Sequence, residues 1–419
     1  MTSTSTGVRN LAATLYAYAF LTDLVLLYPV YALLFADSGL SVGQISSLFV
    51  IWSLAALALE TPSGAWADAT SRRQMLCLAP ICAAAGFALW TFVPSYYAFA
   101  LGFVLWGAGS AFASGALEAL VFDELDHLGA ADRYARTIGR ARTAGTVGVL
   151  VSILLAGPAL QVGGYLAVGV ASIAACGLAL AVATRFPEHR RADAAAPAAG
   201  SELGDDEPGW WQGLRRGVAE ARHDRAVRAA VVLVAAVTAV WSALEEYLPL
   251  LARDTGVALS TVPLLLLLVA AGQIVGGLLA PLGQRLGTGG YALVLAGSAA
   301  ALASGALLRQ WTGFLLVAAA FCGFQLASVL ADTRLQERIS GTDRATVTSL
   351  AGLATDVTGI AVYASYGLLA GVAGNPVAFA VWAVPYLLVA ALLTARARND
   401  APGGGPARTG RVDPARTAL

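Results

Sequence analysis

Four carboxylate side chains stand inside long apolar segments of this sequence: Asp23, Glu245, Glu246 and Asp356. Asp23 comes about 14 residues after Arg9, roughly 21 Å along a helix that rises ~1.5 Å per residue. No arginine in the same segment can neutralise it. A lone carboxylate near the middle of a membrane is a candidate for binding a proton or a cationic substrate. The alternative is a packing role, in which a Tyr or Thr hydroxyl hydrogen-bonds the carboxyl group.

The other three carboxylates lie in the second half of the chain. Glu245 and Glu246 follow Arg228 by about 17 residues, and adjacent helix positions differ by about 100°, so at most one of them faces a cavity squarely. Both could instead lie at the outer rim. Asp356 lies in the inner half of a later segment, where it lines a cavity or has an ordinary role in the contact between domains.

Uncharged polar and aromatic side chains in the same segments could complete a binding cavity. Each has packing or lipid contact as its alternative, which for the aromatic residues is the commoner outcome. The candidates are Gln273, Gln325, Tyr16, Phe20, Trp52, Trp241, Tyr363 and Trp382.

The composition indicates a membrane protein. The chain has 419 residues, of which 58% are hydrophobic and 12% charged, whereas charged residues make up about 25% of soluble domains. A soluble protein of this length cannot hide that much apolar surface, so a soluble enzyme is excluded. The formal net charge is zero, so nothing favours a nucleic-acid partner. The three histidines lie in polar connections, and no metal or cofactor set is expected.

Twelve apolar runs predict an all-α protein with twelve transmembrane helices. The Lys and Arg residues of the chain are all arginines. When both termini are placed on the cytoplasmic side of the cell membrane, only Arg253 and Arg309 fall on outer loops. The predicted helices span residues 10–35, 42–63, 74–93, 96–122, 141–162, 165–186, 229–252, 261–284, 290–309, 312–332, 348–370 and 376–395.

The polar stretches divide the chain into two six-helix domains, 1–186 and 229–396. Between them we expect a cytoplasmic linker, 187–228, whose part from Trp210 to Arg228 has the spacing of an interfacial helix. Residues 397–419 are expected to be a disordered tail. A segment that contains Gly and Arg follows the second helix, and a similar segment from Gly277 to Arg285 follows the eighth. This similarity predicts that the two halves of the chain are repeats.

The segment from Glu60 to Arg73 reads ETPSGAWADATSRR. It resembles the signature loop of the major facilitator superfamily, G-x-x-x-D-x-x-G-R-[RK], with Gly64 and Asp68 in place and Ser71 at the second glycine. The E-x-P-S-G-x-x-A-D form is similar to that of bacterial exporter-like members. The resemblance implies that Glu60, Gly64, Asp68, Arg72 and Arg73 belong to a conformational-switch loop that braces the two domains on the cytoplasmic side.

Charged residues on the fourth and fifth helices extend this cytoplasmic cluster. In a hairpin centred near Gly129, Glu118 faces Arg140 and Asp123 faces Arg136, and ionisable groups near membrane depth are costly unless they are paired. We therefore predict these two pairs. Asp123 is also placed to meet the arginines of the signature loop. The alternative is that these are surface charges just outside the membrane.

The resemblance implies a proton-coupled antiporter that exports a small hydrophobic or cationic compound, such as a drug or antibiotic, by alternating access. The energy source would be the proton gradient, with no cofactor, and the protein would act as a monomer. Phe103 occupies the place of the arginine that proton-coupled exporters often carry in the fourth helix. Proton-coupled nutrient uptake and a non-transporting sensor with the same fold remain as alternatives.

Overall fold

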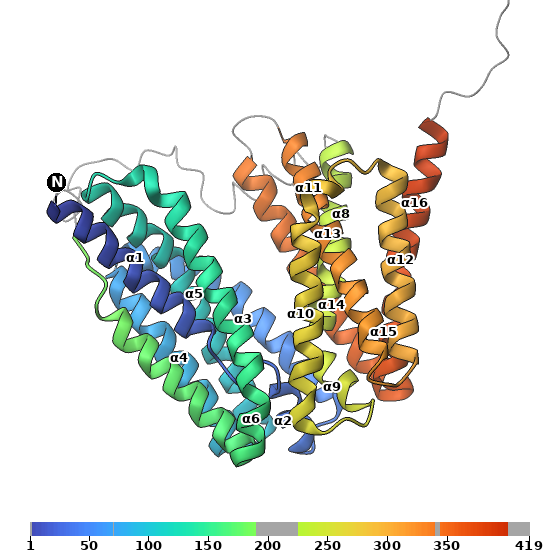
Figure 1. The fold of residues 1–419 in the computed structure, drawn as a ribbon, viewed down its shortest axis with the longest axis horizontal. Coiled ribbons are helices and arrows are strands. Elements are labelled where there is room, and N and C mark those ends of the chain that lie inside the picture. Colours follow the sequence, from blue (N-terminus) through green and yellow to red (C-terminus); the bar gives the residue numbers. More distant parts are fainter. Residues whose placement is uncertain (1, 70, 190–224, 340–343, 401–419) are drawn as a thin grey trace, which may run out of the picture.

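The structure is a computed structural model that describes residues 2–69, 71–189, 225–339 and 344–400 (Figure 1). Its regular elements in these ranges are all helices. The first half of the chain contains α1 (Thr2–Asp23), α2 (Tyr31–Asp37), α3 (Val42–Ala69), α4 (Arg72–Phe92), α5 (Tyr96–His127), the 3₁₀ turn η1 (Ala131–Arg133) and α6 (Tyr134–Ala183).

The second half begins at α8 and is helical to the end of the described chain. It contains α8 (Arg225–Glu245), α9 (Leu248–Arg253), the 3₁₀ turn η3 (Leu259–Thr261), α10 (Val262–Leu278), α11 (Ala280–Gly283), α12 (Thr288–Leu307), α13 (Gly313–Arg338), α14 (Arg344–Ala373), α15 (Asn375–Trp382) and α16 (Val384–Asp400).

Ten helices in the described ranges are long and apolar enough to cross a membrane, and the difference from the twelve predicted runs lies in two places. The first run, 10–35, is divided into α1 and α2 by a non-helical segment around Pro29, because proline lacks the N–H that a helix needs. The backbone N–H of Leu27 in this segment is satisfied by Ser172 Oγ of α6 at 3.1 Å. The runs 141–162 and 165–186 form one element, α6, whose backbone is non-helical at Gly163 and Gly164. Gly164 has φ 59° and ψ −152°, a conformation open to glycine alone.

Several predicted boundaries differ from the structure, and three predicted runs, 229–252, 261–284 and 376–395, are each divided into two helices: α8 and α9, α10 and α11, and α15 and α16. The second helix continues through the signature segment to Ala69 rather than ending near 63, so Gly64 does not end it. The helix α8 begins at Arg225, four residues before the predicted domain start at 229, and α16 continues to Asp400, beyond the predicted end at 396. Each extension lacks a proline that would stop the helix. The predicted interfacial helix up to residue 224, and the tail from 401, lie outside the described residues.

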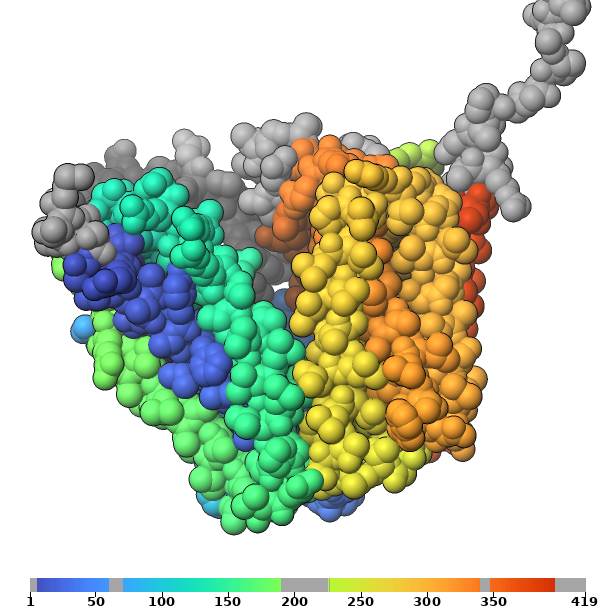
Figure 2. Space-filling view, in the orientation of Figure 1, coloured from blue at the N-terminus to red at the C-terminus, as the bar shows by residue number. Residues whose placement is uncertain are grey.

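The helices form two bundles that meet at one end and diverge toward the other, as Figures 1 and 2 show. The N-terminal bundle, α1 to α6, packs mainly through α4 against α5 and α1 against α6; the C-terminal bundle, α8 to α16, packs through α13 against α10 and α12. The two bundles touch through α3 and α14, and through α6 and α10. We call the end where they meet the closed end, and the end that carries the N-terminus the open end.

Glycines let α10 and α13 approach each other closely. A Cβ atom added at Gly272 would lie 2.4 Å from the carbonyl oxygen of Ala318, and one added at Gly276 would lie 2.2 Å from that of Cys322. Backbone atoms cannot move aside as a flexible side chain can, so this contact requires the glycines.

We therefore expect Gly272→Val to lower the thermal unfolding temperature of the detergent-purified protein, since overpacking costs about 1–3 kcal/mol. The matched control is Gly277→Val on the same helix, because an added Cβ there meets no atom within 4 Å. Differential scanning fluorimetry makes the comparison. Equal unfolding temperatures for the two variants would show that the close approach is not needed.

Candidate functional site

A cavity of about 370 Å³ lies between the two bundles. Its walls come from α3 and α5 on one side and from α8 and α14 on the other. Five Ser and Thr hydroxyl groups, the rings of one Trp and one Tyr, and one carboxylate provide its chemistry: Ser53, Ser110, Ser114, Ser242, Thr355, Trp52, Tyr363 and Asp356. Among the described residues that line this central cavity, Asp356 is the one with a formal charge. The lining therefore offers hydrogen bonds, stacking and a negative charge to a ligand.

The closed end is sealed by polar contacts between the bundles. Arg253 at the end of α9 forms an ion pair with Asp37 at 2.7 Å, and the Tyr165 hydroxyl donates to the same carboxylate at 2.6 Å. Gln161 of α6 donates to Ser260 Oγ at 3.2 Å. Sequence reasoning did not select Asp37, because a carboxylate at the end of a helix resembles any surface charge.

Two further contacts lie between the closed end and the cavity. The hydroxyl of Tyr31 on α2 donates to Glu246, and the hydroxyl of Tyr247 donates to Ser46 Oγ of α3 at 2.7 Å. The ring of Phe49 packs against those of Tyr247 and Tyr363, with centroids 5.3 and 5.4 Å away. These side chains come from both bundles and form the floor of the central cavity.

The predicted carboxylates are therefore distributed over three places. Asp356 lines the central cavity and Glu246 lies at its floor. Glu245 is within hydrogen-bond reach of Gln273 on α10, so these two predicted polar residues meet each other. Asp23, at the end of α1, lines a different cavity.

This second cavity has a volume of about 290 Å³ and lies within the N-terminal bundle. We call it the N-terminal chamber. Its walls come from α1, α4, α5 and α6, and from Tyr28 between α1 and α2. Asp23, Tyr28 and Trp106 line it together with Glu118 and Arg142. Asp23 comes so close to α6 that a Cβ added at Gly145 would lie 2.3 Å from its carboxylate oxygen.

The predicted aromatic residues also separate into groups. Trp52 and Tyr363 line the central cavity. Trp241 does not: it is buried in the C-terminal bundle, where its ring N–H donates to Ser328 Oγ at 2.9 Å. The remaining candidates are half-buried and do not line the two cavities; they are Tyr16, Phe20, Gln325 and Trp382.

The predicted pairs at the open end have different partners from those expected. Asp123 pairs with Arg72 rather than Arg136, in the alternative contact that the sequence had suggested. Glu118 pairs with Arg142 at 3.2 Å rather than with Arg140. The pair of Glu118 with Arg142 is centred on residue 130, one residue after Gly129. A shift of the centre by one residue changes the residue that faces Glu118 by two, from Arg140 to Arg142. The side chains of Glu60, Gly64 and Asp68 lie outside the described residues, and Arg73 is exposed.

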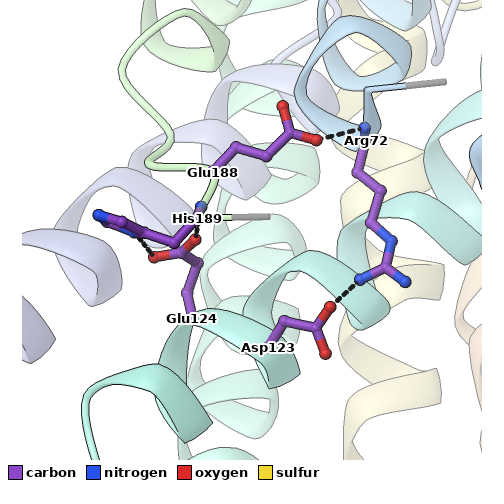
Figure 3. Close-up of polar contacts among 5 residues, drawn as sticks. All are labelled: Arg72, Asp123, Glu124, Glu188 and His189. Carbon is purple, nitrogen blue, oxygen red and sulfur yellow. Dashed lines mark hydrogen bonds and ion pairs between the residues drawn. The ribbon is translucent and has the colours of Figure 1, made fainter. Parts of the chain in front are cut away.

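The residues directly after α6 dock onto this cluster, which sequence reasoning missed (Figure 3). Glu188 accepts a hydrogen bond from the backbone N–H of Arg72 at 2.8 Å and caps the start of α4. Glu124, which is buried, accepts from the backbone N–H of His189 at 2.6 Å and contacts its ring Nδ1 at 2.9 Å. The predicted linker is thus fixed to the N-terminal bundle at its first residues.

Comparison with known proteins places this architecture. The family model described as Major Facilitator Superfamily matches residues 13–362. No curated protein matches the chain. Among solved structures, the nucleoside transporter NupG is similar with a TM-score of 0.71 and 13% identity, over 93% of this chain and 98% of that one. A bacterial homologue of the human lysosomal transporter Spinster is similar with a TM-score of 0.68 and 18% identity, over 94% of this chain and 97% of that one. The fucose:proton symporter of E. coli is similar with a TM-score of 0.52 and 17% identity, over 93% of this chain and 98% of that one.

The geometry of the closed end predicts a cross-link between the bundles. In a background without the four native cysteines, Gln161→Cys combined with Ser260→Cys should be bridged by a short bis-methanethiosulfonate reagent, because the native side chains touch at 3.2 Å. A protease site inserted between residues 200 and 205 detects the bridge, since the two halves then stay together on a non-reducing gel after cleavage.

The control pair is Asp132→Cys with Glu337→Cys, which places one cysteine on each bundle at the open end. We expect no bridge there. Equal bridging of both pairs would contradict an arrangement that is closed at one end and open at the other.

Proposed function

This chain belongs to the Major Facilitator Superfamily, and on that premise we propose that it is a proton-driven secondary transporter that exports a small hydrophobic or cationic compound by alternating access. It is a multi-pass membrane protein with a small-molecule substrate. Family membership and the transporters of similar structure favour transport over enzyme activity.

One observation carries the proposal: the central cavity is lined from both bundles, and the polar contacts that join them across it among the described residues lie at the closed end. If the bundles rock about this cavity, breaking the closed-end contacts opens the site to the opposite side. The polar, exposed ion pair between Asp37 and Arg253 suits a contact that must break and re-form, because such pairs contribute only about 0–1 kcal/mol.

We propose that the open end faces the cytoplasm. Arg253 and Arg309, the two arginines assigned to outer loops, lie at the closed end, whereas Arg72, Arg142 and Arg338 lie at the open end. Both termini would then be inside, by the positive-inside rule. Twelve crossings of the cell membrane follow if the α1–α2 segment and the second arm of α6 each cross once, in addition to the ten apolar helices. Each chain holds a whole cavity, which supports a functional monomer.

The lining of the central cavity supports a neutral or cationic substrate. Asp356 would attract a cation or a group that donates hydrogen bonds, and Trp52 offers a face for stacking or for a cation–π contact. An anionic substrate would need a basic partner, and the described lining residues include none.

We assign proton binding to Asp23, because it lines the N-terminal chamber and lies far along α1 from Arg9. Glu245, Glu246 and Asp356 are the other candidates for binding a proton or the substrate. We propose that the signature segment and its partners form the conformational switch. Two ion pairs of this region, Arg72 with Asp123 and Arg142 with Glu118, are formed at the open end.

Uptake of a nutrient with protons is a second candidate, and the five hydroxyl groups of the cavity favour it. Hydroxyl groups recognise polar, multiply hydrogen-bonding molecules better than lipophilic ones. The similar structures also include a nucleoside transporter and a fucose:proton symporter.

Proteoliposomes with an imposed pH gradient and an internal pH dye test the proposal. They are challenged with ethidium and tetraphenylphosphonium as cations, and with uridine and fucose as neutral polar compounds. We expect a compound-dependent proton flux in the wild type that Asp23→Asn abolishes. Flux opposite to the movement of a cation supports export, and flux in the same direction as uridine or fucose supports uptake.

The matched control is Asp132→Asn, which removes an exposed carboxylate in the turn before α6 and should leave the flux unchanged. Persistent flux in Asp23→Asn would move the proton site to Glu245, Glu246 or Asp356. Absence of flux with every compound would contradict proton-coupled transport and leave a sensor.

A further inference from the structure

The two cavities are connected by a continuous stack of three aromatic rings. Tyr28 lies on Trp106 with ring centroids 5.2 Å apart and planes at 23°. Trp106 lies in turn on Trp52 at 5.1 Å and 10°. The first two rings line the N-terminal chamber, and Trp52 lines the central cavity.

We propose that this stack couples the two sites, so that the charge of Asp23 in the N-terminal chamber sets the position of Trp52 in the central cavity. The inference rests on the proposed function for the identity of the proton site and of the substrate cavity. It assigns Trp106 as a positioning residue that contacts neither ligand.

Separate chambers imply that proton and substrate do not compete for one carboxylate. Asp23 is half-buried and lines the N-terminal chamber, whereas the carboxylate on the central cavity is Asp356. Ser110 on α5, one turn after Trp106, is the residue that lines both. Coupling must therefore pass through the wall between the chambers, which contains Ser110 and the stacked rings.

The rings can transmit a displacement because they are packed on both sides. Trp106 also contacts Phe87 and Phe103, with centroids 5.9 and 6.0 Å away. Trp106 is held between the faces of the two other rings, so a displacement of one ring acts on the next through the stacked faces. A displacement of the Tyr28 ring therefore displaces the Trp52 ring. In the same way, a ligand stacked on Trp52 alters the position of Tyr28 in the chamber that Asp23 lines.

The N-terminal chamber also gives the proton its own route. Its lining runs from Asp23 and Tyr28 to the ion pair of Glu118 and Arg142, whose side chains are 52% and 77% exposed at the open end. A proton on Asp23 could therefore exchange with water at the open end without crossing the central cavity. The titratable or charged side chains that line this chamber with Asp23 are Tyr18, Tyr28, Glu118, Arg142 and Cys176.

A bimane fluorophore at Ser53→Cys tests the coupling without any transported compound. Ser53 lines the central cavity and is adjacent to Trp52, and tryptophan quenches bimane on contact. The full-length protein, with its four native cysteines replaced, is reconstituted in nanodiscs and titrated from alkaline to acid pH. We expect a fluorescence transition that Asp23→Asn abolishes, which assigns the transition to Asp23.

Two variants then break the stack at different points: Trp106→Leu at its centre and Tyr28→Leu on the side of Asp23. Both should abolish the transition, whereas the conservative Trp106→Phe should retain it. The matched control is Trp311→Leu, because Trp311 is 59% exposed and lies outside the stack. Having two breaking variants keeps the test valid if one of them does not fold.

A transition that survives both breaking variants would overturn the role of the stack. A wild type without any transition would also overturn it, since protonation of Asp23 would then not reach the central cavity. Neither result bears on proton-coupled transport itself, which the flux measurement decides separately.

Discussion

The contacts between the bundles at the closed end are the interaction on which the rest of the structure depends. Asp37 with Arg253, Tyr31 with Glu246 and Ser46 with Tyr247 join two bundles that otherwise diverge. Because they lie at one end, they leave a cavity with polar and aromatic side chains between the bundles. The exposed ion pair of Asp37 with Arg253 contributes about 0–1 kcal/mol, and a buried hydrogen bond such as that of Tyr247 with Ser46 contributes about 0.5–1.5 kcal/mol. A closure built from several of them is stable, and in the proposed transport cycle it would be exchanged for a closure at the opposite end.

The membrane environment explains where the polar groups lie. Backbone and charged groups are costly in lipid unless they are paired or face a cavity. The break between α1 and α2 is satisfied by Ser172, and the carboxylates inside the apolar segments line cavities or accept hydrogen bonds. Among the described residues, each buried side-chain nitrogen or oxygen has a partner. Polar groups are thus concentrated where they can bind a ligand or hold the bundles together.

The sequence predicted the helical segments well, because apolar runs of membrane length are a strong signal. It could not predict how each helix is rotated about its axis. α1 is weakly amphipathic, so nothing indicated that Asp23 faces a chamber inside its own bundle rather than the central cavity. The partner of Glu118 depended on the centre of a turn, where one residue changes the pairing by two. The docking of Glu188 and His189 onto α4 and α5 joins residues that are far apart in the chain, and no local pattern records such contacts.

Alternating access requires the two ends of the molecule to move in opposite directions. Double electron–electron resonance measures it directly, with one spin-label pair at Asp132 and Glu337 on the open end and another at Ser38 and Gln310 on the closed end. Changing the pH in nanodiscs should populate a second state in which the first distance shortens and the second lengthens. If both distances change in the same direction, or the open-end distance never shortens, alternating access about this cavity is contradicted.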